Sequence, residues 1–383
     1  MRRVVQPASG LPIHLWGRDV PEGALAQLEL IASQPYVVEH VAAMPDLHVA
    51  HGVAVGTVFA TDDTVVPAAL GGDLGCGMSA VRFDFPAARL SHASLREWLE
   101  AVGRAIPVGD ATHRGKGVRA PDALLATPLS TGALQHARDR LTPRHLGTLG
   151  GGNHFVELDR DGGGALWLLV HSGSRGLGSA IAAHHLRAAQ ESGSGSLPGL
   201  RCDTRAGQAC LSDLEWAFTF ARANRDTLVE RASALVHELT GQAPELSSRV
   251  DVHHNFVRSE EHFGRRMLVH RKGAIAAPLG ETALIPGSMG TASYLVEGLG
   301  EAQSFASASH GAGRVMTRRE AREQIRADRF AQSMRRVVFD ERRRSSLVEE
   351  APEAYRALGD VLEDEADLVV PRVRLVPIAV LKG

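Results

Sequence analysis

The segment Gly71–Met78, GGDLGCGM, places an aspartate and a cysteine three residues apart in a glycine-rich turn. At this spacing the carboxylate of Asp73 and the sulfur of Cys76 can converge on one cation, and a thiolate can bridge two. The glycines let the backbone turn tightly and approach a ligand closely. An isolated pair of this kind is more often a buried thiol in a bend. Further candidate ligands elsewhere in the sequence are therefore needed to favour a metal site over a structural cysteine.

Three further segments supply histidines at positions that are typical of metal ligands. His154 follows three glycines, His171 ends an apolar run, and His254 lies in the strand-like VDVHHNFV. Together with Asp73 and Cys76 they form a set of one carboxylate, one thiolate and three imidazoles. Such a set is enough for two metal ions if the thiolate bridges, and it suits Mn(II), Zn(II), Co(II) or Fe(II).

The segment 309–314, SHGAGR, differs from the others because small residues leave His310 accessible and Arg314 follows four residues later. A neutral imidazole can attack phosphorus, although the spacing equally allows a metal ligand or a general acid or base. The loops 171–178 and 285–294 are rich in small residues that expose backbone amides, which is typical of anion binding. Neither loop matches the P-loop or the dinucleotide-binding pattern.

Composition predicts a globular protein that works in the cytoplasm. The chain has 383 residues, 44% of them hydrophobic, and a formal net charge of −2, which permits nucleic-acid binding without predicting it. It contains no long apolar run or secretion signal, so we expect no membrane association. Its three cysteines are an odd number, which favours reduced thiols over a disulfide framework.

The sequence patterns around these residues predict a mixed β-sheet with peripheral helices. Apolar periodicity predicts helices at Ser179–Gln190, Ser212–Leu239 and Arg318–Phe339, and a surface loop at 191–200. Short apolar runs predict strands at 53–61, 78–85, 165–170, 249–257, 266–276 and 367–383, the last with prolines that suggest edges or bends. We therefore expect an α+β (mixed α/β) fold, a central β-sheet sandwich with peripheral helices, as one domain over residues 1–383.

In combination, these motifs resemble those of the RtcB-type RNA-splicing ligases. The resemblance follows the same order along nearly the whole chain: MPDLHVAHGVAVG (44–56), GGDLGCGM, GTLGGGNHFVEL, HSGSRGLG, DVHHNFV, HRKGA (270–274), PGSMGTASYLV (286–296), SHGAGRVMTR (309–318) and the terminal LKG. Nine ordered motifs make the match highly specific. The resemblance also implies an RtcB-like fold.

What the resemblance implies is a ligase that depends on GTP and on two Mn(II) ions. Such an enzyme joins an RNA 3′-phosphate or 2′,3′-cyclic phosphate to a 5′-hydroxyl, in tRNA splicing or RNA repair. His310 would form a histidine–GMP intermediate and pass GMP to the RNA 3′ end, giving an RNA-3′-pp-5′-G activated end. The partners implied are RNA with these ends and an archease-like protein as a candidate activator.

The resemblance also assigns roles to individual residues. One metal would be bound by Cys76 and His154, and the other by Asp73, Cys76, His171 and His254. The GTP-binding positions would be Asn153, His154, Phe155, Val156, Glu157, His254, Asn255, Pro286, Gly287, Ser288, Met289, Ser293, His310, Gly311, Ala312, Gly313 and Lys382. Arg175 and Arg314 would lie near phosphates as catalytic residues, and Asp46 would assist near the 5′-hydroxyl.

Two other functions stay open. One is a catalytically silent relative that binds RNA or nucleotide, although both His310 and Cys76 are present. The other is a dinuclear-metal phosphodiesterase that opens cyclic phosphate ends without GTP. A test for covalent nucleotide on the protein separates both from the ligase.

Overall fold

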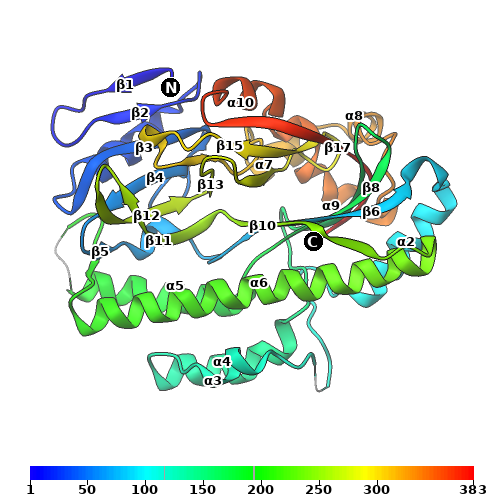
Figure 1. Cartoon of the computed structure of the whole chain (residues 1–383), viewed down its shortest axis with the longest axis horizontal. Helices are drawn as coiled ribbons and strands as arrows, with labels where there is room; N and C mark the ends of the chain where they lie inside the picture. The colour runs from blue at the N-terminus through cyan, green and yellow to red at the C-terminus, as the bar shows by residue number, and fades with distance from the viewer. Residues whose placement is uncertain (116, 193–194) are drawn as a thin grey trace.

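Two large β-sheets form the centre of the computed structural model, which describes residues 1–115, 117–192 and 195–383 (Figure 1). The first sheet has the strand order β1 (Arg3–Val5), β2 (Ile13–Leu15), β3 (Val37–His48), β4 (Val55–Thr61), β12 (Arg265–Lys272), β11 (Asn255–His262). The second has the order β10 (Pro244–His253), β6 (Gly77–Pro86), β8 (Ala165–Ser172), β7 (Phe155–Arg160), β17 (Val369–Lys382), β15 (Ser293–Gly298), β14 (Thr282–Ile285). Two short ladders pair β13 (Ala274–Ala276) with β16 (Ser307–Ser309), and β5 (Thr64–Val65) with β9 (Leu200–Arg201).

The two sheets share a hydrophobic core. Val58 and Val269 of the first sheet pack in one buried cluster with Ile285 and Val296 of the second. Branched side chains suit this role because they fill the pleated surface of a strand. The predicted mixed α/β class, with a central sheet sandwich, is therefore confirmed.

Helices cover the outside of the sheets. They are α1 (Glu22–Ala32), α2 (His92–Ala105), α3 (Asp122–Ala126), α4 (Gly132–His145), α5 (Arg175–Ser192), α6 (Arg205–Thr240), α7 (Arg318–Gln324), α8 (Ala327–Ser333), α9 (Arg344–Leu347) and α10 (Leu358–Asp364). Figure 1 shows the long α6 running beneath the sheets, with α3 and α4 further out. None of the helices in the described ranges is both long and apolar enough to cross a membrane.

The first two predicted helices are confirmed and prove longer than expected. α6 begins after Thr204, whose hydroxyl accepts from Gly207 N, and ends at Gly241, which adopts the left-handed conformation at φ 74°. Both are standard helix boundaries. The loop predicted at 191–200 includes residues 193–194, which lie outside the described residues.

The single helix predicted at Arg318–Phe339 is wrong. α7 and α8 are separate, with Ile325 in an extended conformation between them. In a continuous helix, Ile325 and Phe330 would point roughly 140° apart, because a helix has about 3.6 residues per turn. Both are buried in the same cluster against the second sheet. The break lets the two side chains reach that cluster together.

Two predicted strands are each divided in the structure. The run 249–257 becomes the end of β10 and the start of β11, with His254 at the junction where the chain leaves one sheet for the other. The run 266–276 is interrupted at Gly273, whose φ of 65° interrupts the strand. The predicted C-terminal strand is confirmed as β17, but it lies inside its sheet, and its prolines fall near register shifts instead of at an edge.

A buried carboxyl group next to β16 makes stability depend on pH. Glu365 Oε2 accepts from Ser309 N at 2.9 Å, and Oε1 is buried without a partner. Burial raises the pKa of Glu365 to about 8. Because the folded state then holds a proton that the unfolded chain releases above about pH 4.3, this contribution to stability is complete at low pH and is lost as pH rises toward 8.

We expect Glu365→Gln to remove this loss while keeping an oxygen for Ser309 N. The free energy of unfolding of the variant, relative to wild type, should rise between pH 5 and pH 8, by at most about 1.4 kcal/mol per pH unit. Urea unfolding at a series of pH values measures the difference. A difference that does not change with pH would contradict a protonated Glu365.

Candidate metal and nucleotide site

A cavity of about 300 Å³ gathers most of the residues singled out from the sequence. Its wall is built from loops that leave both sheets, so segments far apart in the chain meet there. The predicted residues that line it are Asp73, Cys76, Asn153, Phe155, His171, His254, Asn255, Pro286, Gly287, Ser288, Met289, His310, Gly311, Ala312, Gly313, Arg314 and Lys382.

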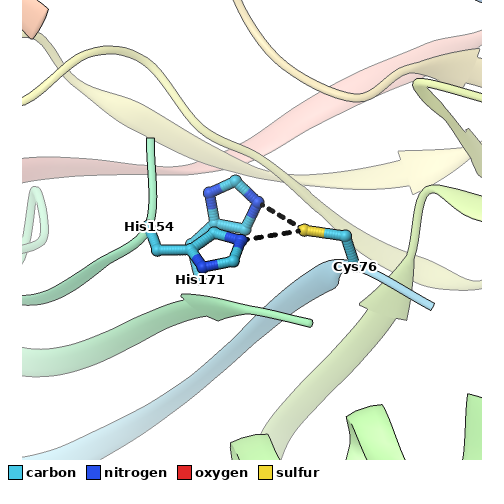
Figure 2. Close-up of side chains that lie close together, drawn as sticks. All are labelled: Cys76, His154 and His171. Atoms are coloured by element: carbon cyan, nitrogen blue, oxygen red, sulfur yellow. Dashed lines mark hydrogen bonds between the residues drawn. The ribbon is translucent and has the colours of Figure 1, made fainter. Parts of the chain in front are cut away.

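The sulfur of Cys76 lies at the floor of this cavity between two imidazoles. Its Sγ is 3.3 Å from Nε2 of His154 and 3.3 Å from Nε2 of His171 (Figure 2). Asp73 Oδ2 approaches the same nitrogen of His154 at 3.0 Å. Cys76, His154 and His171 are all buried, and their donor atoms lie within 4.8 Å of one another. This is the spacing expected of ligands that share a cation.

The backbone orients both imidazoles toward the sulfur. His154 Nδ1 lies 2.9 Å from Leu149 O, and His171 Nδ1 lies 3.3 Å from Asn153 O. A carbonyl can only accept, so each Nδ1 donates to its carbonyl, and each Nε2 faces the sulfur of Cys76. This arrangement is common for histidines that bind metals.

His254 and His310 extend this group into a row of rings. The ring centroids of His171 and His254 are 5.1 Å apart, and those of His254 and His310 are 4.9 Å apart. His254 Nδ1 is buried without a hydrogen-bond partner. A buried polar atom that lacks a partner is costly, so this nitrogen is available to a ligand in the cavity.

The electrostatics of the site favour a bound cation. Burial lowers the pKa of His171 and of His254 far below the usual range, which keeps both imidazoles neutral. Burial and the neighbouring Asp73 raise the pKa of the Cys76 thiol well above its usual range. Although burial opposes it, contact with His154 lowers the pKa of Asp73. A cation would supply the positive charge that a thiolate needs here, so the donor set fits a divalent metal.

Glycines allow the close approaches that build the floor. A Cβ on Gly173 would lie 2.2 Å from Asp73 Oδ1, so only glycine lets this loop pass the carboxylate. Gly150 adopts φ 90°, and a Cβ there would lie 2.0 Å from the Arg175 guanidinium. Arg175 thus packs under the glycine loop and does not line the cavity, although it was predicted near a phosphate.

Asp46 lies against the nucleophile candidate. Its Oδ2 is 2.6 Å from Nδ1 of His310, and its side chain is fully buried, whereas the His310 side chain is 16% exposed. The two atoms are close enough for a hydrogen bond, but neither one has a hydrogen-bond partner in this arrangement. Contact through Nδ1 leaves Nε2 of His310 as the nitrogen free to react.

A cluster of cations surrounds one buried carboxylate at the cavity wall. Glu350 accepts from Lys382 Nζ at 3.2 Å, from Arg314 Nη1 at 3.2 Å and from Tyr355 OH at 2.6 Å. Arg318 Nε approaches it at 3.3 Å. Although burial opposes it, Lys382 and these other donors lower the pKa of Glu350 to about 2. The carboxylate therefore holds the cations in place.

Four predicted residues lie outside the cavity lining, in addition to Asp46 and Arg175. His154 does not line the cavity, but its Nε2 contacts the sulfur of Cys76. Ser293 Oγ accepts from Gly287 N at 3.2 Å and so holds the loop 286–289. Glu157 is buried beside Asp159, and burial raises its pKa well above the usual range. Val156 packs into the hydrophobic cluster on the opposite face of β7.

Several lining residues were not singled out from the sequence. His48, Lys272, Arg318, Glu350 and Tyr355 all line the cavity. Lys272 and Arg318 stand within conspicuous motifs, and Lys272 is one of only three lysines in the chain. Glu350 and Tyr355 lie in a segment with no recognisable motif.

Two consecutive residues of α6 hold the backbone that carries the ligands. The Asn224 side chain donates to Thr148 O at 3.1 Å and to Gly173 O at 3.2 Å, and accepts from Gly147 N at 2.7 Å. Its neighbour Arg225 is bidentate on a carboxylate of β10 and fully buried.

Arg225 fixes the segments on both sides of the thiol. It donates through Nη1 to Gly75 O at 2.9 Å and to Ser172 O at 3.2 Å, next to Cys76 and His171. The only sequence signal for this role is that Asn224 and Arg225 fall on the otherwise apolar face of their helix.

Comparisons with known proteins identify close relatives. The family model "tRNA-splicing ligase RtcB" matches residues 27–383. The chain is 35% identical to "RNA-splicing ligase RtcB" of Escherichia coli K12, over 97% of each protein. It is 30% identical to the protein of that name from Mycobacterium tuberculosis, over 93% of this chain and all of the relative. It is 29% identical to "tRNA-splicing ligase RtcB" of Thermococcus kodakarensis, over 94% and 91%.

The role of Arg225 in holding the ligand backbone can be tested through metal affinity. Arg225→Lys keeps the charge but loses the planar fork that reaches Asp251 and two carbonyl oxygens at once. We expect Mn(II) to bind about 10- to 100-fold more weakly, as is usual when groups that support metal ligands are removed. Isothermal titration calorimetry measures the affinity.

The matched control is Arg222→Lys, one turn earlier on the same helix. The Arg222 side chain is 64% exposed, and its Nε lies 3.6 Å from Asp251 Oδ2. This control should bind Mn(II) like wild type. Wild-type affinity in a folded Arg225→Lys protein would show that the ligands do not depend on the Arg225 contacts.

Proposed function

Because the chain belongs to the RtcB family of tRNA-splicing ligases, we propose that it is a GTP- and Mn(II)-dependent ligase that joins RNA 3′-phosphate or 2′,3′-cyclic phosphate ends to 5′-hydroxyl ends. The whole chain, residues 1–383, would act as a single catalytic domain. The observation that carries the mechanism is the position of His310, which lines the cavity and lies against both Asp46 and His254.

Ligation of a 3′-phosphate end requires nucleotide energy. A 3′-phosphate is a poor electrophile because its leaving group would be hydroxide or water. Attaching GMP to that phosphate converts the leaving group into a nucleotide phosphate, which leaves readily. A protein residue that first accepts GMP divides the transfer into two easier steps.

His310 suits this covalent role. Nε2 of His310 would attack the α-phosphorus of GTP, forming a P–N bond while the P–O bond to pyrophosphate breaks. Asp46 at Nδ1 would hold the ring and stabilise the positive charge that it develops, as a carboxylate does for a catalytic histidine. Asp46 would therefore act on the nucleophile, and its expected role near the 5′-hydroxyl stays a prediction.

Two further transfers would complete the reaction. An oxygen of the RNA 3′-phosphate attacks the same phosphorus and breaks the P–N bond, which gives RNA-3′-pp-5′-G and restores His310. The 5′-hydroxyl then attacks the RNA phosphorus and expels GMP. A cyclic phosphate end must first be opened by water to give the 3′-phosphate.

The metal ligands proposed from the sequence fit this chemistry. Asp73, Cys76, His154, His171 and His254 would hold two Mn(II) ions, with the Cys76 thiolate shared between them. Bound cations neutralise charge on a phosphoryl group and orient it for in-line attack. The neutral imidazoles and the unpartnered Nδ1 of His254 support such a site.

The remaining lining residues would bind the nucleotide. Lys382, Arg314 and Arg318 present positive charge that Glu350 holds in place, and phosphates would compete for their donors. Residues of the loops 286–289 and 311–313 line the same cavity and would contact the nucleotide. Asn153, Phe155 and Asn255 line it as well and would contact the nucleotide.

We further propose that the protein works in the cytoplasm on tRNA or on broken RNA, with an archease-like protein as a candidate activator. Cys76, Cys202 and Cys210 are all free thiols, which suits a reducing compartment.

The covalent intermediate gives the sharpest test. Incubation with Mn(II) and α-labelled GTP should label the wild-type protein through a bond that is labile in acid and stable in base. His310→Ala should take up no label, whereas the exposed His92→Ala should label like wild type. Asp46→Asn should label on the order of 10²-fold more slowly or worse, because the ring loses its orienting carboxylate.

Two results would overturn the proposal. Label that survives His310→Ala would place the nucleotide on another residue. A wild-type protein that takes no label, yet opens 2′,3′-cyclic phosphates with Mn(II) alone, would be a phosphodiesterase.

A further inference from the structure

A group of arginines lies outside the nucleotide cavity, next to the loop 286–292 that contributes to the cavity wall. Arg329, Arg335 and Arg336, on α8 and the segment after it, face Arg374 of β17 across a hollow of about 540 Å³. We call this surface the arginine hollow. Its single lining carboxylate, Glu353, lies 3.6 Å from Arg329.

Most of this positive charge is not neutralised by the protein. Within the described ranges, Arg335, Arg336 and Arg374 make no ion pair or side-chain hydrogen bond, and all three are exposed. Elsewhere on this surface arginines are commonly paired, as Arg322 is with Glu349 and Arg372 with Glu297. Unpaired arginines that face one hollow indicate an anionic partner.

The positive surface continues beyond the arginine hollow. Arg374 and Val376 also line an adjoining hollow of about 360 Å³, whose other wall includes Arg160 and Asp161 at the β7–β8 turn. The Asp161 carboxylate accepts from Ala165 N and Trp167 Nε1, both at 2.9 Å, and is therefore engaged by its own turn. Figure 1 shows α8, β8 and β17 together at this end of the molecule.

One loop connects the arginine hollow to the nucleotide cavity. Pro286–Met289 line the cavity, and the next residues, Gly290–Ala292, line the hollow. The loop then enters β15, where Tyr294 pairs with Arg374. A polymer that has one end in the cavity and passes over this loop would reach the arginines.

We propose that the arginine hollow and its continuation to Arg160 bind the phosphodiester backbone of the RNA strand whose end is in the cavity. A polyanion with regularly spaced phosphates fits successive unpaired guanidinium groups over two adjoining hollows better than a single small anion does. These contacts are independent of base sequence, so they suit a ligase that must accept varied RNA ends. The inference rests on the proposed ligase function.

The test uses the full chain, in its Mn(II)-loaded form, and an RNA oligonucleotide with a 3′-phosphate and no GTP, so that no ligation occurs. Fluorescence anisotropy over a range of salt concentrations gives the affinity and its salt dependence. For the double variant Arg335→Glu/Arg336→Glu we expect at least about 10-fold weaker binding. The slope of log K against log salt should fall by about 1.4, since each phosphate contact on a single strand contributes about 0.7.

The control is Arg3→Glu, an exposed residue on β1 at the opposite end of the molecule in Figure 1, which should bind RNA like wild type. Thermal unfolding midpoints close to wild type would show that both variants are folded. If the double variant keeps the wild-type affinity and salt slope, the arginine hollow does not bind RNA. This result is distinct from failure of the ligase proposal, in which the wild-type protein itself takes no GMP label.

Discussion

The geometry of the site depends on the contacts that the buried sulfur of Cys76 makes with its neighbours. Two neutral imidazoles approach it at 3.3 Å, and Asp73 lies beside them. Burial and the neighbouring Asp73 raise the pKa of this thiol well above its usual range, so both oppose a thiolate at this position. A bound divalent cation would reverse this balance, because its charge offsets the cost of burying the thiolate. Metal binding and deprotonation of Cys76 would then be one event, and affinity for metal should increase with pH.

Elements from both sheets and from α6 hold the Cys76 sulfur and the neighbouring histidines at fixed positions. Cys76 precedes one strand, His171 ends another, and His254 stands where the chain passes between the two sheets. No local segment brings them together, so their geometry depends on contacts between elements. Arg225 provides such contacts from a helix, since it fixes the backbone beside Cys76 and His171 simultaneously. His310 extends the same group at its outer end, where a substrate can enter.

The sequence singled out most of the residues that the cavity brings together, and it predicted the general architecture, because glycine-rich turns and apolar runs are local patterns. It failed where tertiary packing decides. Ile325 and Phe330 break an amphipathic helix to reach one cluster, and Gly273 interrupts a strand. The contact between Asp46 and His310 was not predicted, since only the folded chain brings the two together. No sequence motif pointed to Glu350, because its role depends on the cationic side chains that the fold places around it.

Titration with Co(II) can show whether Cys76 binds metal as a thiolate. A thiolate bound to cobalt gives a strong near-ultraviolet charge-transfer band that imidazole and carboxylate ligands do not give. We expect this band in the wild-type protein and in Cys202→Ser, and its loss in Cys76→Ser. An undiminished band in Cys76→Ser, or a wild-type protein that binds cobalt without the band, would contradict this expectation.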